Sequence, residues 1–112
     1  MELIPEDAKL VTLSKASRAR THAAEGAAVR DVDGRTYTAA TVDLPSLQIS
    51  ALALAVAQAV SSGARGLEAA AVATGAGFVT DADLAAVRDL GGGAVPVFVA
   101  DQAGNPQTQV DS

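Results

Sequence analysis

The amino-acid sequence predicts an α/β protein, a three-layer α/β/α sandwich whose mixed sheet of about four to five strands carries helices on both faces. Three observations support this fold class. Segments with helical periodicity alternate with short β segments along the chain. Residues 67–74, LEAAAVAT, form a short apolar run followed by glycines, which is typical of a strand covered on both faces. Residues 44–60, LPSLQISALALAVAQAV, are apolar around nearly a whole helical circumference, and such a helix must be covered on all sides.

Length and composition fit one domain over residues 1–112, with a polar tail at residues 101–112. A chain of 112 residues buries roughly two-thirds of the surface that its unfolded form exposes, so a core can form without disulfides. Hydrophobic residues make up 49% of the chain but aromatic residues only 3%. The core must therefore consist of small aliphatic side chains, which allow the backbones to pack closely.

Charge and cysteine content exclude several classes of function. The net charge of -5 and the pI of about 4.5 argue against a nucleic-acid partner, which requires clustered lysines and arginines. The absence of cysteine excludes disulfides, thiolate metal sites and cysteine nucleophiles. The first ten residues, MELIPEDAKL, are acidic where a signal peptide is basic, and no apolar run reaches the roughly 20 residues of a membrane helix. We expect a cytoplasmic protein that does not bind membranes.

In the first part of the chain, residues 5–20 are predicted to form a helix, because a proline and two acidic residues suit a helix N-terminus. The inner stripe of this helix consists of Leu10, Val11, Leu13 and Ala16. Asp33 and Gly34 then lie between two β segments and predict a hairpin of strands 26–31 and 35–42, because Asp-Gly favours the positive φ angles of a tight turn.

In the second part, the long apolar stretch predicts a helix over 46–61, which ends before a glycine. A buried strand over 67–74 follows. Residues 80–90 begin with a Thr-x-x-Asp capping sequence and predict a third helix. Residues 94–100 predict another strand, placed at an edge or a strand end by its proline. The tail, 101–112, either forms one short strand or frays.

Several scaffold residues occur in an order and spacing typical of one family. They are Gly26, Ala27, Ala28, Asp33, Gly34, Tyr37, Val42 and Gly63. With these residues the chain resembles the small homo-tetrameric cytidine deaminases over most of its length. In that family the first strand carries a Val-Gly-Ala-Ala run. The resemblance implies a cytidine deaminase-like fold and assembly into a homo-oligomer, either a dimer or a tetramer.

The catalytic residues of that family are missing from this sequence. The family's second helix begins Cys-Ala-Glu and its third begins Pro-Cys-x-x-Cys. Position by position, Ser50 stands at the first cysteine and Leu52 at the glutamate, while Thr80 and Asp83 stand at the two cysteines of the second motif. A zinc deaminase needs three protein ligands and a glutamate that moves protons. The resemblance therefore implies a degenerate member without zinc, without another cofactor and without catalytic residues.

The family's substrate-binding positions are altered as well. Thr41 and Asp43 stand where the family has an asparagine and a glutamate that hold the ribose, and Ala23 lies about where a phenylalanine contacts the base. One interpretation is a weak pocket for a small-molecule nucleoside, in which Asp43 accepts hydrogen bonds from the sugar. The other is that Asp43 caps the following helix or faces water.

The remaining polar residues add little to these hypotheses. His22 is the only histidine, and without a visible partner we interpret it as a surface loop residue. We expect a non-catalytic cytidine deaminase-like protein with a structural, interaction or weak nucleoside-binding role. Two alternatives stay open. One is a hydrolase of this family, or a repurposed enzyme, that acts on a nucleoside-like substrate, and the other is a nucleoside sensor without chemistry.

Overall fold

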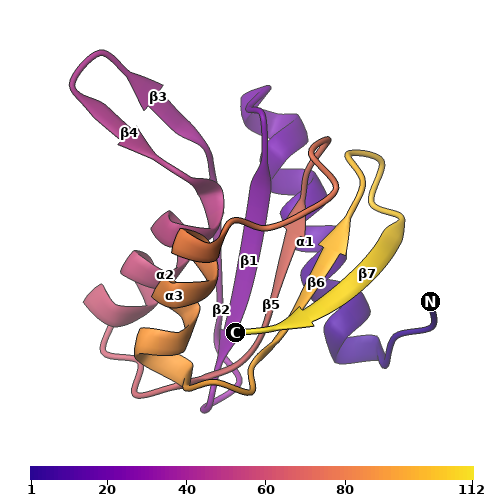
Figure 1. Cartoon of the computed structure of the whole chain (residues 1–112), viewed down its shortest axis with the longest axis vertical. Coiled ribbons are helices and arrows are strands. Elements are labelled where there is room, and N and C mark those ends of the chain that lie inside the picture. The colour runs from indigo at the N-terminus through magenta and orange to yellow at the C-terminus, as the bar shows by residue number, and fades with distance from the viewer.

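The computed structural model describes all 112 residues and contains three helices and seven strands (Figure 1). In chain order these are α1 (Pro5–Thr21), β1 (Gly26–Asp31), β2 (Thr36–Ala40), β3 (Val42–Leu44), β4 (Leu47–Ile49), α2 (Ala51–Ser61), β5 (Leu67–Ala73), α3 (Asp81–Gly91), β6 (Pro96–Ala100) and β7 (Pro106–Asp111). None of the helices combines the length and the apolarity that a membrane crossing requires.

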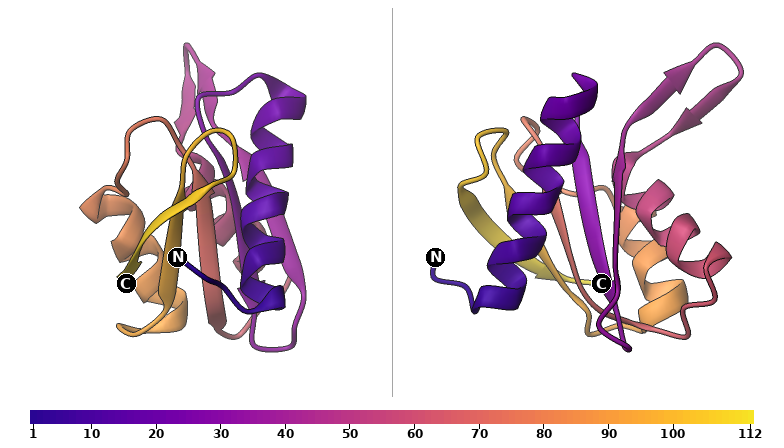
Figure 2. Two further views of the ribbon diagram at one scale, coloured as in Figure 1. Left: turned by 90° about the vertical axis from the view of Figure 1, so that its right-hand side faces the viewer. Right: turned by 180° about the vertical axis from the view of Figure 1, so that it is seen from behind.

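Five strands form one mixed sheet in the order β2-β1-β5-β6-β7, and β5 with β6 is its only parallel pair. Helix α1 covers one face of this sheet, while α2 and α3 cover the other (Figure 2). The predicted three-layer α/β/α architecture is therefore confirmed. The parallel pair follows from chain order, because the connection from β5 to β6 contains α3 and returns the chain to the same end of the sheet.

Alanine, valine and leucine dominate the core, as the composition predicts. Between the sheet and α2 with α3 lies a cluster that includes Ala27, Val29, Leu52, Ala55, Val72 and Val97. A smaller cluster lies under α1 and consists of Leu10, Val11, Ala28, Ala69, Ala71, Phe98 and Ala100. Central strand β5 contributes residues to both clusters, which explains why its sequence is apolar without alternation.

The predicted inner stripe of α1 is partly wrong. Leu10 and Val11 are buried, but Ala16 is exposed, and the serines Ser14 and Ser17 are buried instead. The reason is the close approach of α1 to β1 at Gly26, where an added Cβ would lie only 2.0 Å from the carbonyl oxygen of Ser14. A helix face this close to a backbone holds only small side chains, and the Ser14 hydroxyl stays satisfied by donating to the Val11 carbonyl oxygen at 2.8 Å.

The predicted second helix begins five residues too early. Helix α2 starts at Ala51, and the preceding residues form β3 and β4, a separate two-stranded antiparallel sheet in which Leu44 pairs with Leu47. Ser50 has an extended backbone with φ -66° and ψ 155°, and it caps the helix. The predicted strand 35–42 is likewise divided between β2 and β3, because Thr41 leaves the main sheet and its amide donates to the carbonyl oxygen of Glu25.

The polar tail forms an ordered strand, β7, rather than a frayed end. It follows a loop with the same hydrogen bonds as the loop between β1 and β2. In both loops an aspartate Oδ1, of Asp31 or Asp101, accepts from the amides two and four residues later. The glycine three residues after each aspartate has a positive φ, 84° at Gly34 and 87° at Gly104. The predicted β1–β2 turn is therefore a longer loop, and Gly34 is its only residue with a positive φ.

Candidate functional site

The N-termini of α2 and α3 meet through three of the residues that the sequence singled out. Ser50 Oγ caps α2 by accepting from the amide of Ala53 at 3.2 Å. Thr80 Oγ1 caps α3 by accepting from the amide of Asp83 at 3.2 Å. The Ser50 hydroxyl also donates to Asp83 Oδ1 at 2.6 Å. Ser50, Thr80 and Asp83 therefore form one connected hydrogen-bonded group.

Leu52 lies away from this group. Its side chain is 1% exposed and belongs to the core cluster between the sheet and α2. The second residue of α2, two positions after its cap, thus serves packing and carries no proton donor or acceptor.

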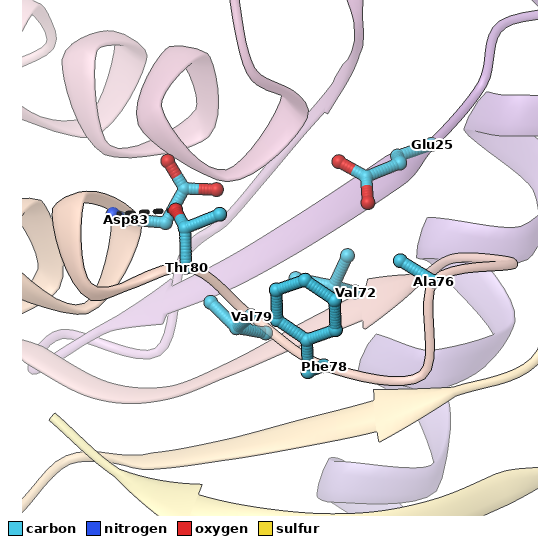
Figure 3. Close-up of a pocket in the computed structure, with 7 residues that line it drawn as sticks. All are labelled: Glu25, Val72, Ala76, Phe78, Val79, Thr80 and Asp83. Carbon is cyan, nitrogen blue, oxygen red and sulfur yellow. Dashed lines mark hydrogen bonds between the residues drawn. The ribbon is translucent and has the colours of Figure 1, made fainter.

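A small cavity opens beside the two helix N-termini (Figure 3). Its volume is about 50 Å³, and its lining consists of Glu25, Val72, Ala76, Phe78, Val79, Thr80 and Asp83. Pockets for small organic ligands usually measure about 300–1,000 Å³, whereas one water molecule occupies about 30 Å³ in the liquid. The cavity therefore has room for a water molecule or a small ion, but not for a nucleoside.

Glu25 is a residue of this cavity that the sequence analysis missed. It directly precedes the Gly-Ala-Ala run of β1, where the family's Val-Gly-Ala-Ala run has an apolar residue, and this change was the signal available in the sequence. Glu25 Oε2 accepts from the hydroxyl of buried Thr74 at 2.5 Å. The Thr74 Oγ1 in turn accepts from the amide of Ala76 at 3.0 Å, so the carboxylate is held at the end of β5.

Two carboxylates, those of Glu25 and Asp83, face the cavity, and no basic residue lines it. They lie on opposite sides of the opening, and the ring of Phe78 lies between them in Figure 3. Asp83 also belongs to the first turn of α3, where the partial positive charge of the helix N-terminus stabilises a carboxylate. Phe78 is 61% exposed, so the mouth of the cavity is apolar.

Of the three predicted nucleoside-contacting residues, Thr41 and Asp43 line the same hollow and Ala23 does not. The hydroxyl of Thr41 accepts from the amide of Glu25 at 3.0 Å and donates to the carbonyl oxygen of the same residue at 3.3 Å, so its partners belong to the chain itself. Asp43 is exposed and lines an open depression of about 290 Å³ together with Thr41, Gln48 and Ser50. Ala23 is half-buried between α1 and β1 and lines neither hollow.

The structure excludes a capping role for Asp43. Its carboxylate does not cap α2, because Ser50 supplies the cap. Asp43 instead faces water on the projecting hairpin. His22 is exposed at the end of α1, with a left-handed backbone at φ 55°, which confirms its prediction as a surface loop residue.

The fold and the paired helix N-termini define the class of protein, an α/β/α sandwich of the deaminase type. The family model described as cytidine deaminase-like matches residues 3–104, so the chain belongs to that family. No curated protein matches the sequence.

Solved structures with the same fold include three bacterial cytidine deaminases. The enzyme from Burkholderia pseudomallei has a TM-score of 0.78 and 23% identity, with 92% of this chain and 90% of that chain covered. The enzyme from Mycobacterium leprae has a TM-score of 0.75 and 19% identity, with 97% and 94% covered. The enzyme from Mycobacterium tuberculosis has a TM-score of 0.70 and 23% identity, with 88% and 86% covered. At these identities the likeness demonstrates the shared fold.

The residues between the two helix N-termini do not fit the zinc ion that zinc deaminases use. Protein zinc sites are built from cysteine, histidine and carboxylate side chains. Here two neutral hydroxyls, those of Ser50 and Thr80, stand with the single carboxylate of Asp83. No three histidine, cysteine, aspartate or glutamate side chains gather anywhere in the chain. The donor set at this place is that of a hydrogen-bonded helix junction.

Proposed function

We propose that this protein is a non-catalytic member of the cytidine deaminase-like family, with a structural or interaction role that it performs as a homo-oligomer. The observation that carries the proposal is the hydrogen bond from Ser50 to Asp83, which joins the helix N-termini directly. We further propose that Ser50, Thr80 and Asp83 correspond to the three zinc-ligand positions of the active family members. Leu52 corresponds to their glutamate position.

The rate contributions of the zinc ion and of the general acid/base are large enough to support this proposal. A zinc ion lowers the pKa of its bound water to about 7, so its loss makes hydroxide scarcer by roughly eight to nine powers of ten at neutral pH. Loss of the general acid/base costs a further factor of about a hundred to ten thousand. Deamination by the zinc mechanism would therefore fall below detection.

The burial of Leu52 supports the same conclusion. A glutamate in the place of Leu52 would bring its carboxyl group to a site that is 1% exposed and surrounded by alanine and valine. Without a cation beside it, the desolvation of that carboxylate would cost several kcal/mol. Leucine instead adds apolar contacts, so the residue fits a chain that no longer performs proton transfer here.

The outward surface of α2 supports self-association. The sheet covers Ala51, Leu52 and Ala55, but Ala57 and Val60 remain exposed, with Val60 54% exposed. The expectation that this apolar helix is covered on all sides is therefore not met within one chain. A second copy is the partner that we propose for the uncovered side.

Weak binding of a nucleoside, in the manner of a sensor, is a second candidate function. Its support is the open depression of about 290 Å³ at the base of the hairpin, where Asp43 and Gln48 offer an exposed carboxylate and an amide. A bound nucleoside would raise the melting temperature of the wild-type chain but not of the Asp43→Ala variant. A flat response across the common nucleosides would remove this candidate.

The decisive experiment combines zinc analysis of the purified protein with a cytidine deamination assay. We expect no stoichiometric zinc and no uridine. One zinc per chain, or conversion of cytidine to uridine, would overturn the proposal.

A designed variant tests the position assignment separately. In the triple variant Ser50→Cys, Thr80→Cys and Asp83→Cys, three thiols would stand at the junction, and we expect about one zinc per chain and a zinc-dependent rise in melting temperature. The matched control keeps Ser50 and carries its third cysteine at Ser61, at the far end of α2. Equal zinc uptake by the control, or none by the triple variant, would contradict the assignment.

A further inference from the structure

The hairpin of β3 and β4 projects from the body of the molecule and leaves its tip without a neighbour. Figures 1 and 2 show it extending beyond the main sheet, away from α2 and α3. The two strands contact chiefly each other. At the tip Leu44 pairs with Leu47, and the two side chains are 54% and 49% exposed. An isolated two-stranded hairpin is at best marginally stable in water, so this arm needs a surface to pack against.

A second apolar surface lies on helices α2 and α3 of the same chain. Between α2 and α3 runs an open groove of about 420 Å³. Its lining consists of Ala53, Val56, Ala57, Val60, Ala86, Asp89 and Leu90. All of these residues except Asp89 are apolar. Ala57 and Val60 are exposed, Ala53, Ala86 and Leu90 are half-buried, and Val56 is buried at the floor of the groove. The hairpin tip of the same chain points away from the groove, so one molecule does not fill its own groove.

We propose that the β3–β4 hairpin of one copy docks into the α2–α3 groove of a second copy. This inference rests on the self-association in the proposed function and adds the surface that performs it. One chain carries both a projecting apolar arm and a hollow apolar groove, and a two-fold arrangement lets each copy give an arm and receive one. Such an exchange uses both surfaces twice, which helps a small chain to reach the roughly 1,200–2,000 Å² that a stable interface buries.

Charge favours this route of assembly. Each chain has a net charge of -5, so two copies repel one another over most of their surface. Residues 44–47 at the tip of the arm carry no charge, and Asp43 is the only charged residue of the arm. The groove contains a single ionisable residue, Asp89, which is exposed and can keep its water. Leu44 and Leu47 can therefore enter the groove while the exposed carboxylates of Asp43 and Asp89 keep their water.

Light scattering of the full chain and two designed variants tests the surfaces. We expect the wild type to be a dimer or larger at micromolar concentration. We expect both Leu44→Ser with Leu47→Ser in the arm and Ala57→Gln with Val60→Gln in the groove to weaken association at least tenfold. Val32→Ser is the matched control, because Val32 is an equally exposed apolar residue on the β1–β2 loop, and it should leave association unchanged. All four substituted residues of the arm and the groove lie outside the buried core. Equal melting temperatures of the monomeric wild type and the monomeric variants would therefore show that the variants are folded.

Cysteine cross-linking tests the contact itself, and the natural chain contains no cysteine that could interfere. Leu47→Cys chains mixed with Val60→Cys chains should form a mixed disulfide dimer under mild oxidation. Cross-linking only between two Leu47→Cys chains, or no cross-linking, would overturn the arm-in-groove contact. A monomeric wild type would refute both self-association and this inference. An oligomer that survives both the arm and the groove substitutions would refute this inference alone.

Discussion

The hydroxyl of Ser50 donates a 2.6 Å hydrogen bond to Oδ1 of Asp83, and this one contact joins the start of α2 to the first turn of α3. The same hydroxyl oxygen accepts from the amide of Ala53, so a single side chain caps one helix and links it to another. Asp83 has a matching double role, because its amide donates to the cap residue of α3. The junction is stabilised by hydrogen bonds that all lie within the chain.

Ser50→Ala removes both functions of that hydroxyl. We expect the free energy of unfolding to fall by about 1–2 kcal/mol, through loss of the helix cap and of one hydrogen bond to a carboxylate. Urea denaturation measures the change. Ser46→Ala is the control, because Ser46 is exposed in the hairpin turn and its hydroxyl makes no hydrogen bond within the chain. Equal stability of the two variants would contradict the double role of Ser50.

Leu52→Glu tests whether this position belongs to the core. The variant places a carboxylate at a site that is 1% exposed, so we expect a loss of more than about 3 kcal/mol or failure to fold. Leu54→Glu, two residues later on the same helix, changes a half-buried side chain and should cost about 1 kcal/mol. Thermal unfolding compares the two. A tolerated Leu52→Glu would mean that the position retains access to water.

Asp31 in the β1–β2 loop and Asp101 in the β6–β7 loop should make the free energy of unfolding depend on pH. Burial of Asp31 acts to raise its pKa, but hydrogen bonds from the Tyr37 hydroxyl and the amides of Arg35 and Asp33 outweigh burial, so the pKa lies below its ordinary value of 3.8. Hydrogen bonds from the backbone and side chain of Asn105 likewise lower the pKa of Asp101.

For carboxyl groups with a lowered pKa in the folded state, the stabilisation is present above the unfolded pKa and is lost as pH falls through the folded pKa. We expect the urea midpoint of the wild type to fall as the pH drops from about 5 through about 3, and Asp31→Asn to lower the midpoint at neutral pH and flatten this dependence. Asp33→Asn in the same loop is the control, because its carboxylate is exposed. A wild-type slope that Asp31→Asn leaves unchanged would refute this role.

Gly26→Ala tests the close contact of α1 with β1. The added Cβ would lie 2.0 Å from the carbonyl oxygen of Ser14 and 2.7 Å from the amide nitrogen of Arg18, so the helix must move away from the sheet. We expect a loss of about 3 kcal/mol or more in unfolding free energy. Gly93→Ala is the matched control, since its nearest neighbour would lie 3.9 Å away. Similar melting temperatures for the two variants would contradict the packing described here.

Local patterns in the sequence were sufficient for the three helices, for strands β1, β2, β5 and β6 and for the layered fold, but not for the β3–β4 hairpin. Apolar periodicity, the glycines after residues 67–74 and the Thr80 cap each depend on residues near one another in the chain. The β6–β7 hairpin could also have been predicted, because its Asp-x-x-Gly loop repeats the pattern of Asp31 and Gly34.

By itself, the sequence determined the fold class, the aliphatic core and the absence of cysteine. Only the tertiary structure decided which partners the remaining polar groups have. Asp83 could have completed a local capping box with Thr80, but its carboxylate accepts from Ser50 on another helix instead. Glu25 reaches Thr74, 49 residues later, and buried serines rather than Ala16 face the sheet. Such contacts depend on distances between elements, which packing sets and local periodicity does not encode.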